Sequence, residues 1–133
     1  MVMEFRFEFA EAENILRLTL SGDMTDQAVL ELWTVGVPTA AAHSSSRLIV
    51  DTTSVTRFSV SPRAVNTLAK RHSPDLPMRV IVAPSDLLYG TSRMFQTLTE
   101  STRKNVHIVR TMQEAYKVLG VEAPKFVPIN PQR

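Results

Sequence analysis

Two serine residues stand where helices are expected to begin, and a hydroxyl at such a place can cap the helix or carry a phosphate. Ser61 precedes Pro62, a residue favoured at the first helical position, and Ser85 follows the proline of the segment APSDLL. Free N–H groups and the helix dipole stabilise an anion at a helix N-terminus. A cap with no further role is the simpler interpretation of both serines, and such a cap contributes about 1 kcal/mol.

Asp51 is the carboxylate whose position is most suggestive of chemistry, because it closes the apolar stretch RLIVD. The phosphoacceptor aspartate of receiver domains has a similar place, but those domains also carry an acidic pair after the first strand and a lysine after the last. This chain opens with two strands that predict an antiparallel hairpin, and its last strand is followed by Arg110 and Thr111. We therefore expect Asp51 to accept backbone N–H groups in the following turn.

The sequence contains no spacing typical of metal ligands or of phosphate-binding glycines. His43, His72 and His107 do not stand at ligand spacing, and the chain has no cysteine. Its four glycines form neither the dinucleotide-binding nor the P-loop motif. Because no histidine is expected near the two serines, we predict no catalytic residue, no metal, no cofactor and no enzymatic activity.

The segment APSDLLYGTSRMF places Gly90 in the first turns of a helix, at a cost of about 1 kcal/mol relative to alanine. We expect the close approach of a backbone, a partner or a ligand to explain this glycine. Tyr89, Arg93, Gln96 and Glu100 follow helical spacing and form a polar stripe. A solvated face is the simpler interpretation of the stripe, and a recognition surface is the alternative, because tyrosine and arginine often anchor interfaces.

The composition is that of one folded domain rather than of a disordered chain. Of the 133 residues, 44% are hydrophobic and 21% are charged. A net charge of +2 is too small for sequence-independent binding to nucleic acid, so we expect no nucleic-acid partner. No apolar run is long enough to span a membrane, and no secretory signal is visible, so we expect a cytoplasmic protein.

Alternating apolar and polar residues predict a hairpin over residues 4–9 and 16–21. Thr25 then caps a helix that carries Val29 and Leu32 on its inner face, and Gly36 and Pro38 predict a kink or a stop near residue 37. Further strands are expected at residues 47–51, 78–83 and 105–109, with a loop over residues 52–60.

Three more helices complete the expected pattern. One runs from Ser61 to about residue 72, and one follows Ser85 with Leu87, Leu88, Met94, Phe95 and Leu98 as its apolar positions. The last lies between a capping box of Thr111 with Glu114 and a stop at Gly120. Residues 1–120 then form the domain, and the proline-rich tail of residues 121–133 is expected to be an extended arm.

The order β-β-α-β-α-β-α-β-α predicts an α/β fold, with a mostly parallel five-stranded sheet edged by the N-terminal hairpin. Open sheets of this type usually bind ligands outside the carboxyl ends of the strands. The residues expected at that edge are Asp51, residues 52–60, Ser61, Ser85, Asp86, Tyr89, Arg93 and Arg110.

This order, together with the stretch LIVDTTSVTRFSVSPRAVNTLA, resembles the STAS superfamily. Residues 4–120 look more closely like the small bacterial SpoIIAA-like proteins, with VIVAPSDLLYGTSRMFQTL as the most specific stretch. In the antagonist branch of that superfamily a serine after the third strand is phosphorylated by a partner kinase, and Ser61 matches it. Ser59 takes the place of an aspartate in that motif, Val60 of a first serine and Pro62 of a glycine.

The resemblance implies a binding module of bacterial regulation that docks on a protein partner, with phosphorylation of Ser61 as its switch. The candidate binding and regulatory residues are Asp51, Ser59, Ser61, Ser85, Asp86, Tyr89, Gly90 and Arg93. SpoIIAA-like proteins are also similar in fold to CRAL-TRIO lipid-transfer domains, which implies the alternative of an apolar ligand or a membrane surface. Leu68, Leu88, Met94 and Phe95 are the candidates to line such a ligand site.

The sequence leaves self-association open. A strand edge bearing Phe5, Phe7 and Phe9, or the proline-rich tail, would be suited to a symmetric homodimer, which is the commonest homo-oligomer.

Overall fold

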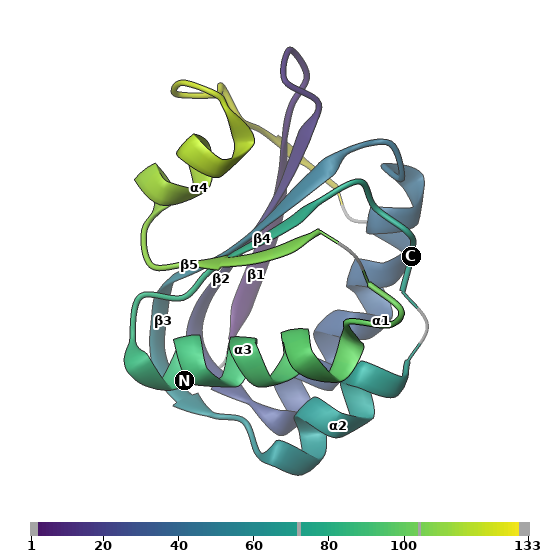
Figure 1. The fold of residues 1–133 in the computed structure, drawn as a ribbon, viewed down its shortest axis with the longest axis vertical. Coiled ribbons are helices and arrows are strands. Elements are labelled where there is room, and N and C mark those ends of the chain that lie inside the picture. Colours follow the sequence, from purple (N-terminus) through teal and green to yellow (C-terminus); the bar gives the residue numbers. More distant parts are fainter. Residues whose placement is uncertain (1–2, 72, 104, 131–133) are drawn as a thin grey trace.

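The computed structural model describes residues 3–71, 73–103 and 105–130, so that His72 lies outside the described residues. The described chain forms four helices and a six-stranded sheet (Figure 1). Its elements are β1 (Glu4–Ala10), β2 (Ile15–Thr25), α1 (Asp26–Ala42), β3 (Arg47–Ser59), α2 (Pro62–Lys70), β4 (Arg79–Val82), α3 (Asp86–Thr99), β5 (Val106–Val109), α4 (Met112–Leu119) and β6 (Val127–Ile129).

The strand order across the sheet is β5-β4-β3-β2-β1-β6. Strands β2, β3, β4 and β5 are parallel, whereas β1 is antiparallel to both β2 and β6. The α/β class and the N-terminal hairpin are therefore confirmed. The sheet has one more strand than the five expected from the sequence.

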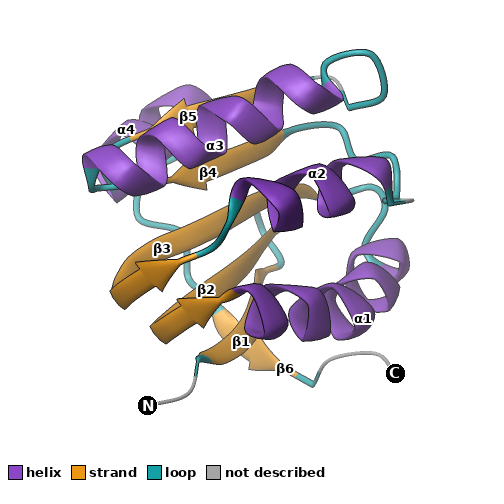
Figure 2. Cartoon of the chain, turned by 90° about the horizontal axis from the view of Figure 1, so that it is seen from below, coloured by secondary structure: helices purple, strands orange, loops and turns teal. Residues whose placement is uncertain are grey.

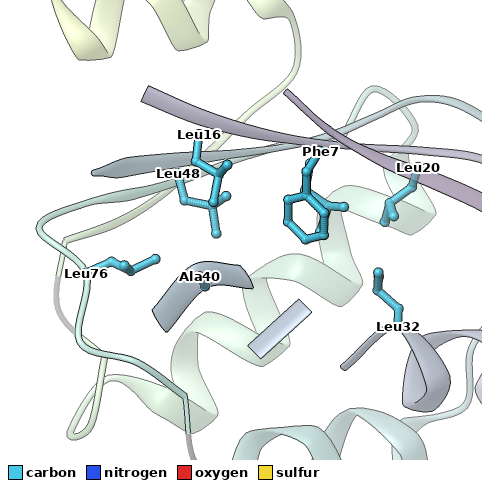
Figure 3. Close-up of a cluster of buried hydrophobic side chains, with 8 residues drawn as sticks. Phe7, Leu16, Leu20, Leu32, Ala40, Leu48 and Leu76 are labelled. Carbon is cyan, nitrogen blue, oxygen red and sulfur yellow. The ribbon is translucent and has the colours of Figure 1, made fainter. Parts of the chain in front are cut away.

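The helices cover the two faces of the sheet unequally. Helices α1, α2 and α3 lie on one face and α4 lies on the other (Figures 1 and 2). On the three-helix face, Phe7 and Leu16 of the sheet pack with Leu32 and Ala40 of α1 (Figure 3). On the α4 face, Ile49 and other buried strand residues pack with Ala115 and Leu119 of α4.

The hairpin places its polar side chains on the α4 face. Phe7 is buried on the three-helix face, while Glu8 lies opposite Arg17 in the register of β1 and β2. Arg17 donates to Glu8 Oε1 through Nε at 3.1 Å and through Nη2 at 2.6 Å. Burial raises the pKa of Glu8, but the hydrogen bonds and charges of Arg17 and Arg6 outweigh it and hold that pKa below its ordinary value.

Helix α1 continues through Pro38 to Ala42, so of the kink or stop expected near residue 37 the stop is wrong. A proline removes one backbone hydrogen bond and crowds the preceding turn, at a cost of about 3 kcal/mol. Thr39 and Ala40, which follow the proline, are both buried. Burial of this last turn against the core offsets the cost of the proline, and no local sequence signal reports that burial.

Strand β3 runs to Ser59 instead of ending at Asp51, so the expected loop over residues 52–60 is mostly strand. The partner strand β2 is equally extended, and the two remain paired as far as Thr25 with Ser59. Residues 52–56 are rich in β-branched side chains, which favour strands. These β-branched residues were the sequence signal for a longer strand, and the acidic Asp51 was wrongly interpreted as the end of the strand.

The tail contains β6, which pairs with β1 through Phe7 with Ile129 and Phe9 with Val127. The expectation of a purely extended arm is therefore wrong. Arg17 also lies over the ring of Phe126 at 4.1 Å from its centroid, which joins the tail to the sheet. A three-residue strand containing a proline carries little strand signal of its own, and pairing with the free edge of β1 stabilises it.

Candidate functional site

A partly open cavity of about 220 Å³ lies between the sheet and helices α1, α2 and α3. Its walls are almost entirely apolar. The sheet contributes Phe7, Leu18, Leu20, Met24, Leu48, Val50, Phe58 and Ile81, and the helices contribute Val29, Leu32, Trp33, Gly36, Val37, Val65, Leu68, Leu88, Thr91, Ser92 and Phe95. Small residues on the inner faces of two helices, such as Gly36 and Ser92, leave space that larger side chains would fill.

Three of the four residues predicted to line an apolar site do so. Leu68 of α2 and Leu88 and Phe95 of α3 line the cavity, whereas Met94 does not. Phe95 meets Trp33 of α1 edge to face, with ring centroids 6.4 Å apart. Residues of α1, α2 and α3 therefore all line the cavity. The periodicity of each helix alone does not indicate that the three helices share one cavity.

Two buried arginines, Arg79 and Arg103, interrupt the apolar wall, and neither was among the residues predicted to line it. Arg79 opens β4 on the same side of the strand as Ile81, and its Nη2 donates to Ser73 Oγ at 2.8 Å and to the carbonyl of Pro74. Arg103 follows α3 and donates through Nη2 to the carbonyl of Arg71 at 2.9 Å. An arginine at position 79 within the otherwise apolar run MRVIVA was the available signal.

Burial lowers the pKa values of both arginines, and neither forms an ion pair with a described carboxylate. Burial lowers the pKa of Arg79, the charge of Arg103 lowers it further, and the charge of Asp75 partly opposes both. Burial also lowers the pKa of Arg103. The guanidinium of Arg103 lies near two aromatic rings, 5.5 Å from the centroid of Trp33 and 5.2 Å from that of Phe95.

Ser61 lies near the carboxyl ends of β2 and β3, where it forms two hydrogen bonds with Asp26. The Ser61 hydroxyl donates to Asp26 Oδ2 at 2.7 Å, and the Ser61 backbone N–H donates to Asp26 Oδ1 at 2.6 Å. The same hydroxyl oxygen accepts from the backbone N–H of Ala64 at 3.2 Å and so caps α2. These two hydrogen bonds from Ser61 lower the pKa of Asp26.

The other candidates near Ser61 have separate surroundings. Ser59 is exposed and ends β3 opposite Thr25. Asp51 is buried within β3, and its Oδ1 accepts from the backbone N–H of Thr53 at 2.9 Å and from the Thr53 hydroxyl at 2.7 Å. Asp51 therefore accepts a nearby backbone N–H as expected, although in a strand rather than in a turn.

A second group forms at the start of α3. Ser85 caps the helix by accepting from the backbone N–H of Leu88 at 3.1 Å. The exposed Asp86 accepts from Arg110 Nη1 at 2.8 Å, and the guanidinium of Arg110 lies 4.2 Å from the ring centroid of Tyr89. Among the described residues, no hydrogen bond or ion pair joins this group to the Ser61–Asp26 pair.

The outer face of α3 differs from expectation in two ways. Gly90 is exposed, and a Cβ placed on it would meet no atom of the described chain within 4 Å, so no close backbone approach within this chain explains it. Leu87 and Leu98 are exposed rather than inward, with 59% and 43% of their surfaces accessible. Arg93 donates to Gln96 Oε1 at 2.8 Å, and Gln96 in turn donates to the carbonyl of Val106 at 2.6 Å.

Within the described ranges, no group of three or more acidic or histidine side chains is gathered closely enough to hold a metal ion. None of the described helices combines the length and the apolar character that crossing a membrane requires.

No protein-family model and no curated protein matches the sequence. A solved structure with the same architecture comes from Shewanella loihica PV-4 and is described as an uncharacterized protein from the DUF3478 family with a SpoIIAA-like fold. The similarity has a TM-score of 0.59 at 13% sequence identity and covers 89% of this chain and 94% of the other. At that identity the comparison concerns the fold, and it agrees with the resemblance found in the sequence: this chain has a SpoIIAA-like fold.

Proposed function

We propose that this protein binds an apolar small molecule in the cavity between the sheet and helices α1, α2 and α3. The observation that supports the proposal is the size of this cavity together with its apolar lining. Protein interiors are normally packed as densely as organic crystals, and an unfilled apolar space costs stability in proportion to its volume. A protein that keeps such a space gains stability when a ligand fills it.

The volume is sufficient for a real ligand. An engineered apolar cavity of about 150 Å³ stays dry and binds benzene. The cavity here has a volume of about 220 Å³ and is partly open, so a ligand has a route of entry. Taking a methylene group as roughly the size of a water molecule in the liquid, ~30 Å³, the enclosed part holds about seven such groups.

Binding of a neutral, environment-sensitive fluorophore tests the proposal. N-phenyl-1-naphthylamine, which fluoresces strongly in apolar surroundings, is titrated into the protein, and 1-octanol is then added as a competitor. We expect saturable binding with one site per chain and displacement by the alcohol. Absence of saturable binding, or binding that 1-octanol does not compete, contradicts the proposal.

A matched pair of variants assigns the signal to the cavity. Ser92 and Thr97 are both polar residues of α3, but Ser92 lines the cavity and Thr97 is exposed. Ser92→Leu adds volume inside the cavity and is expected to weaken probe binding at least tenfold, whereas Thr97→Leu is expected to leave it unchanged. Equal behaviour of the two variants would place the probe elsewhere on the protein.

A second candidate function is docking of a protein partner at the edge around Ser61, with phosphorylation as the switch. It is supported by the 2.7 Å contact between the Ser61 hydroxyl and Asp26. A phosphate adds about −1.5 to −2 charges, and the repulsion between it and the Asp26 carboxylate would break the contact between the first residue of α1 and the residue that caps α2. The local surface would then differ between the two states.

Partner capture from the native host tests the second candidate. The wild type, Ser61→Ala and Ser61→Asp are used as baits, and the captured proteins are quantified by mass spectrometry. We expect a specific partner to bind the wild type and to differ by at least tenfold between the two variants. If both variants capture the same proteins equally well, phosphorylation of Ser61 does not control docking.

A further inference from the structure

We propose that the ligand of this cavity is an aliphatic carboxylate whose head group is bound by Arg103 and Arg79. The inference rests on the proposed function, because it assigns a head group to the ligand of the same cavity. The observation behind it is that two buried cations, Arg79 and Arg103, lie in a wall that is otherwise apolar. An uncharged ligand would not explain their presence there.

Both arginines are buried and have no ion-pair partner in the part of the chain that the structure describes. Arg103 is 7% exposed and Arg79 is 8% exposed. Within the described residues, neither guanidinium forms an ion pair; the pairs present involve Arg6, Arg17 and Arg110. A buried charge is normally paired, because removing an ion from water costs several kcal/mol that only an opposite charge and hydrogen bonds return.

The donors of Arg103 are incompletely used. An arginine has five N–H donors. Arg103 Nη2 donates to the carbonyl of Arg71 at 2.9 Å and Nη1 to the carbonyl of Ala69 at 3.4 Å, so the side chain also caps the C-terminal end of α2. Its Nε is buried and has no acceptor among the described residues. Capping of α2 therefore accounts for only part of this guanidinium.

The second arginine makes an anion more favourable at this place. Arg79 and Arg103 both line the cavity, and the charge of Arg103 lowers the pKa of Arg79, which the exposed Asp75 opposes only in part. A single negative charge between the two guanidiniums would counteract that effect and supply the missing acceptor.

The chemistry of the site favours a carboxylate on an alkyl chain. The planar guanidinium matches a carboxylate through two parallel N–H donors, and the rings of Trp33 and Phe95 lie beside that of Arg103. The remaining lining is apolar and suits a hydrocarbon. Space for about seven methylene-sized groups corresponds to the alkyl part of octanoate, and the open side allows a longer chain to extend outward.

A pair of ligands that differ only in the head group tests the inference without any mutation. Octanoate and 1-octanol are compared near neutral pH as competitors of N-phenyl-1-naphthylamine on the full chain. Hydrogen bonds to a charged group contribute enough for roughly a tenfold to hundredfold difference. We expect octanoate to bind at least tenfold more tightly than 1-octanol.

Variants then assign the preference to the arginines. Arg103→Gln is expected to remove most of the preference for octanoate over 1-octanol, and the ratio of the two affinities in each variant is the quantity compared. Arg103→Lys, which retains a charge without the planar fork, is expected to be intermediate. Arg110→Gln is the control, because Arg110 is paired with Asp86 at the start of α3 and does not line the cavity. A thermal melt of each variant verifies that it is folded.

The outcomes separate this inference from the proposed function. If the probe binds and both competitors displace it equally well, the cavity binds apolar molecules and the carboxylate assignment is overturned. If octyl phosphate binds more tightly than octanoate, the head group is a phosphate and the assignment is also overturned. If the probe does not bind at all, the proposed function itself fails.

Discussion

Asp26, the first residue of α1, accepts two hydrogen bonds from Ser61, the residue that caps α2. The two residues are thirty-five positions apart in the chain, and parallel pairing of β2 with β3 brings them together, because Thr25 lies opposite Ser59 in the register. One carboxylate thus joins the starts of two helices, and the serine proposed above as a phosphorylation switch is also part of the structure that holds them.

The Asp26–Ser61 contact predicts a loss of stability in acid. The Ser61 hydroxyl, followed by the Ser61 backbone N–H, lowers the pKa of Asp26 from its ordinary value of 3.8. A carboxyl group whose pKa is lower in the folded state contributes stability above its unfolded pKa, and the contribution disappears as the pH falls through the folded value. Urea unfolding of the wild type and of Asp26→Asn is compared from about pH 7 to about pH 2. We expect the wild type to be more stable near neutral pH and the difference to vanish in acid; a pH-independent difference would contradict this assignment.

Substitutions of Ser61 should be coupled to Asp26. Ser61→Ala removes the helix cap and is expected to destabilise the protein by about 1 kcal/mol. Aspartate is itself a good capping residue, so Ser61→Asp would be nearly neutral if position 61 were isolated. Because its carboxylate would face Asp26, we expect Ser61→Asp to be at least as destabilising as Ser61→Ala. Adding Asp26→Asn should restore stability to Ser61→Asp but not to Ser61→Ala, and additive effects in this cycle would disprove the coupling.

Gly90 and Gly120 should respond in opposite directions to alanine. Neither position has an atom of the described chain within 4 Å of an added Cβ, but Gly120 has a φ of +69° at the end of α4. Gly90→Ala, inside α3, is expected to stabilise the protein by about 1 kcal/mol, because alanine is the better helix former. Gly120→Ala is expected to destabilise it by about 1 kcal/mol, because a side chain disfavours the left-handed conformation. Chemical denaturation of both variants provides the measurement, and a destabilising Gly90→Ala would contradict this interpretation of the helix.

Removal of β6 should expose a strand edge that promotes self-association. β6 pairs with β1 along Phe7–Phe9, and an uncovered edge offers unpaired N–H and C=O groups to another chain. A chain ending at Gly120 is expected to form dimers or larger species at concentrations at which the longer chain shows less association. Sedimentation velocity measures the difference, and Val127→Thr serves as a control that keeps β6 while reducing its exposed apolar surface. Equal self-association of the shortened chain and the full chain would mean that the exposed edge of β1 does not promote association.

The sequence alone determined the elements whose signals are local. The alternation of residues 4–9, the proline after Ser61 and the capping box of Thr111 with Glu114 each depend on neighbouring residues, and each is found where it was predicted. The same signals, together with the resemblance to SpoIIAA-like proteins, were sufficient for the fold class.

Only the tertiary structure decided features that depend on distant partners. β6 exists because β1 offers an edge, and α1 passes Pro38 because the core buries the turn beyond it. The same holds for the site. Arg79 lies at the start of a strand and Arg103 in the segment after a helix, and no short-range pattern indicates that both line one apolar cavity. Local spacing encodes the direction of a side chain along its own element, whereas the volume and charge of a cavity arise from how several elements pack together.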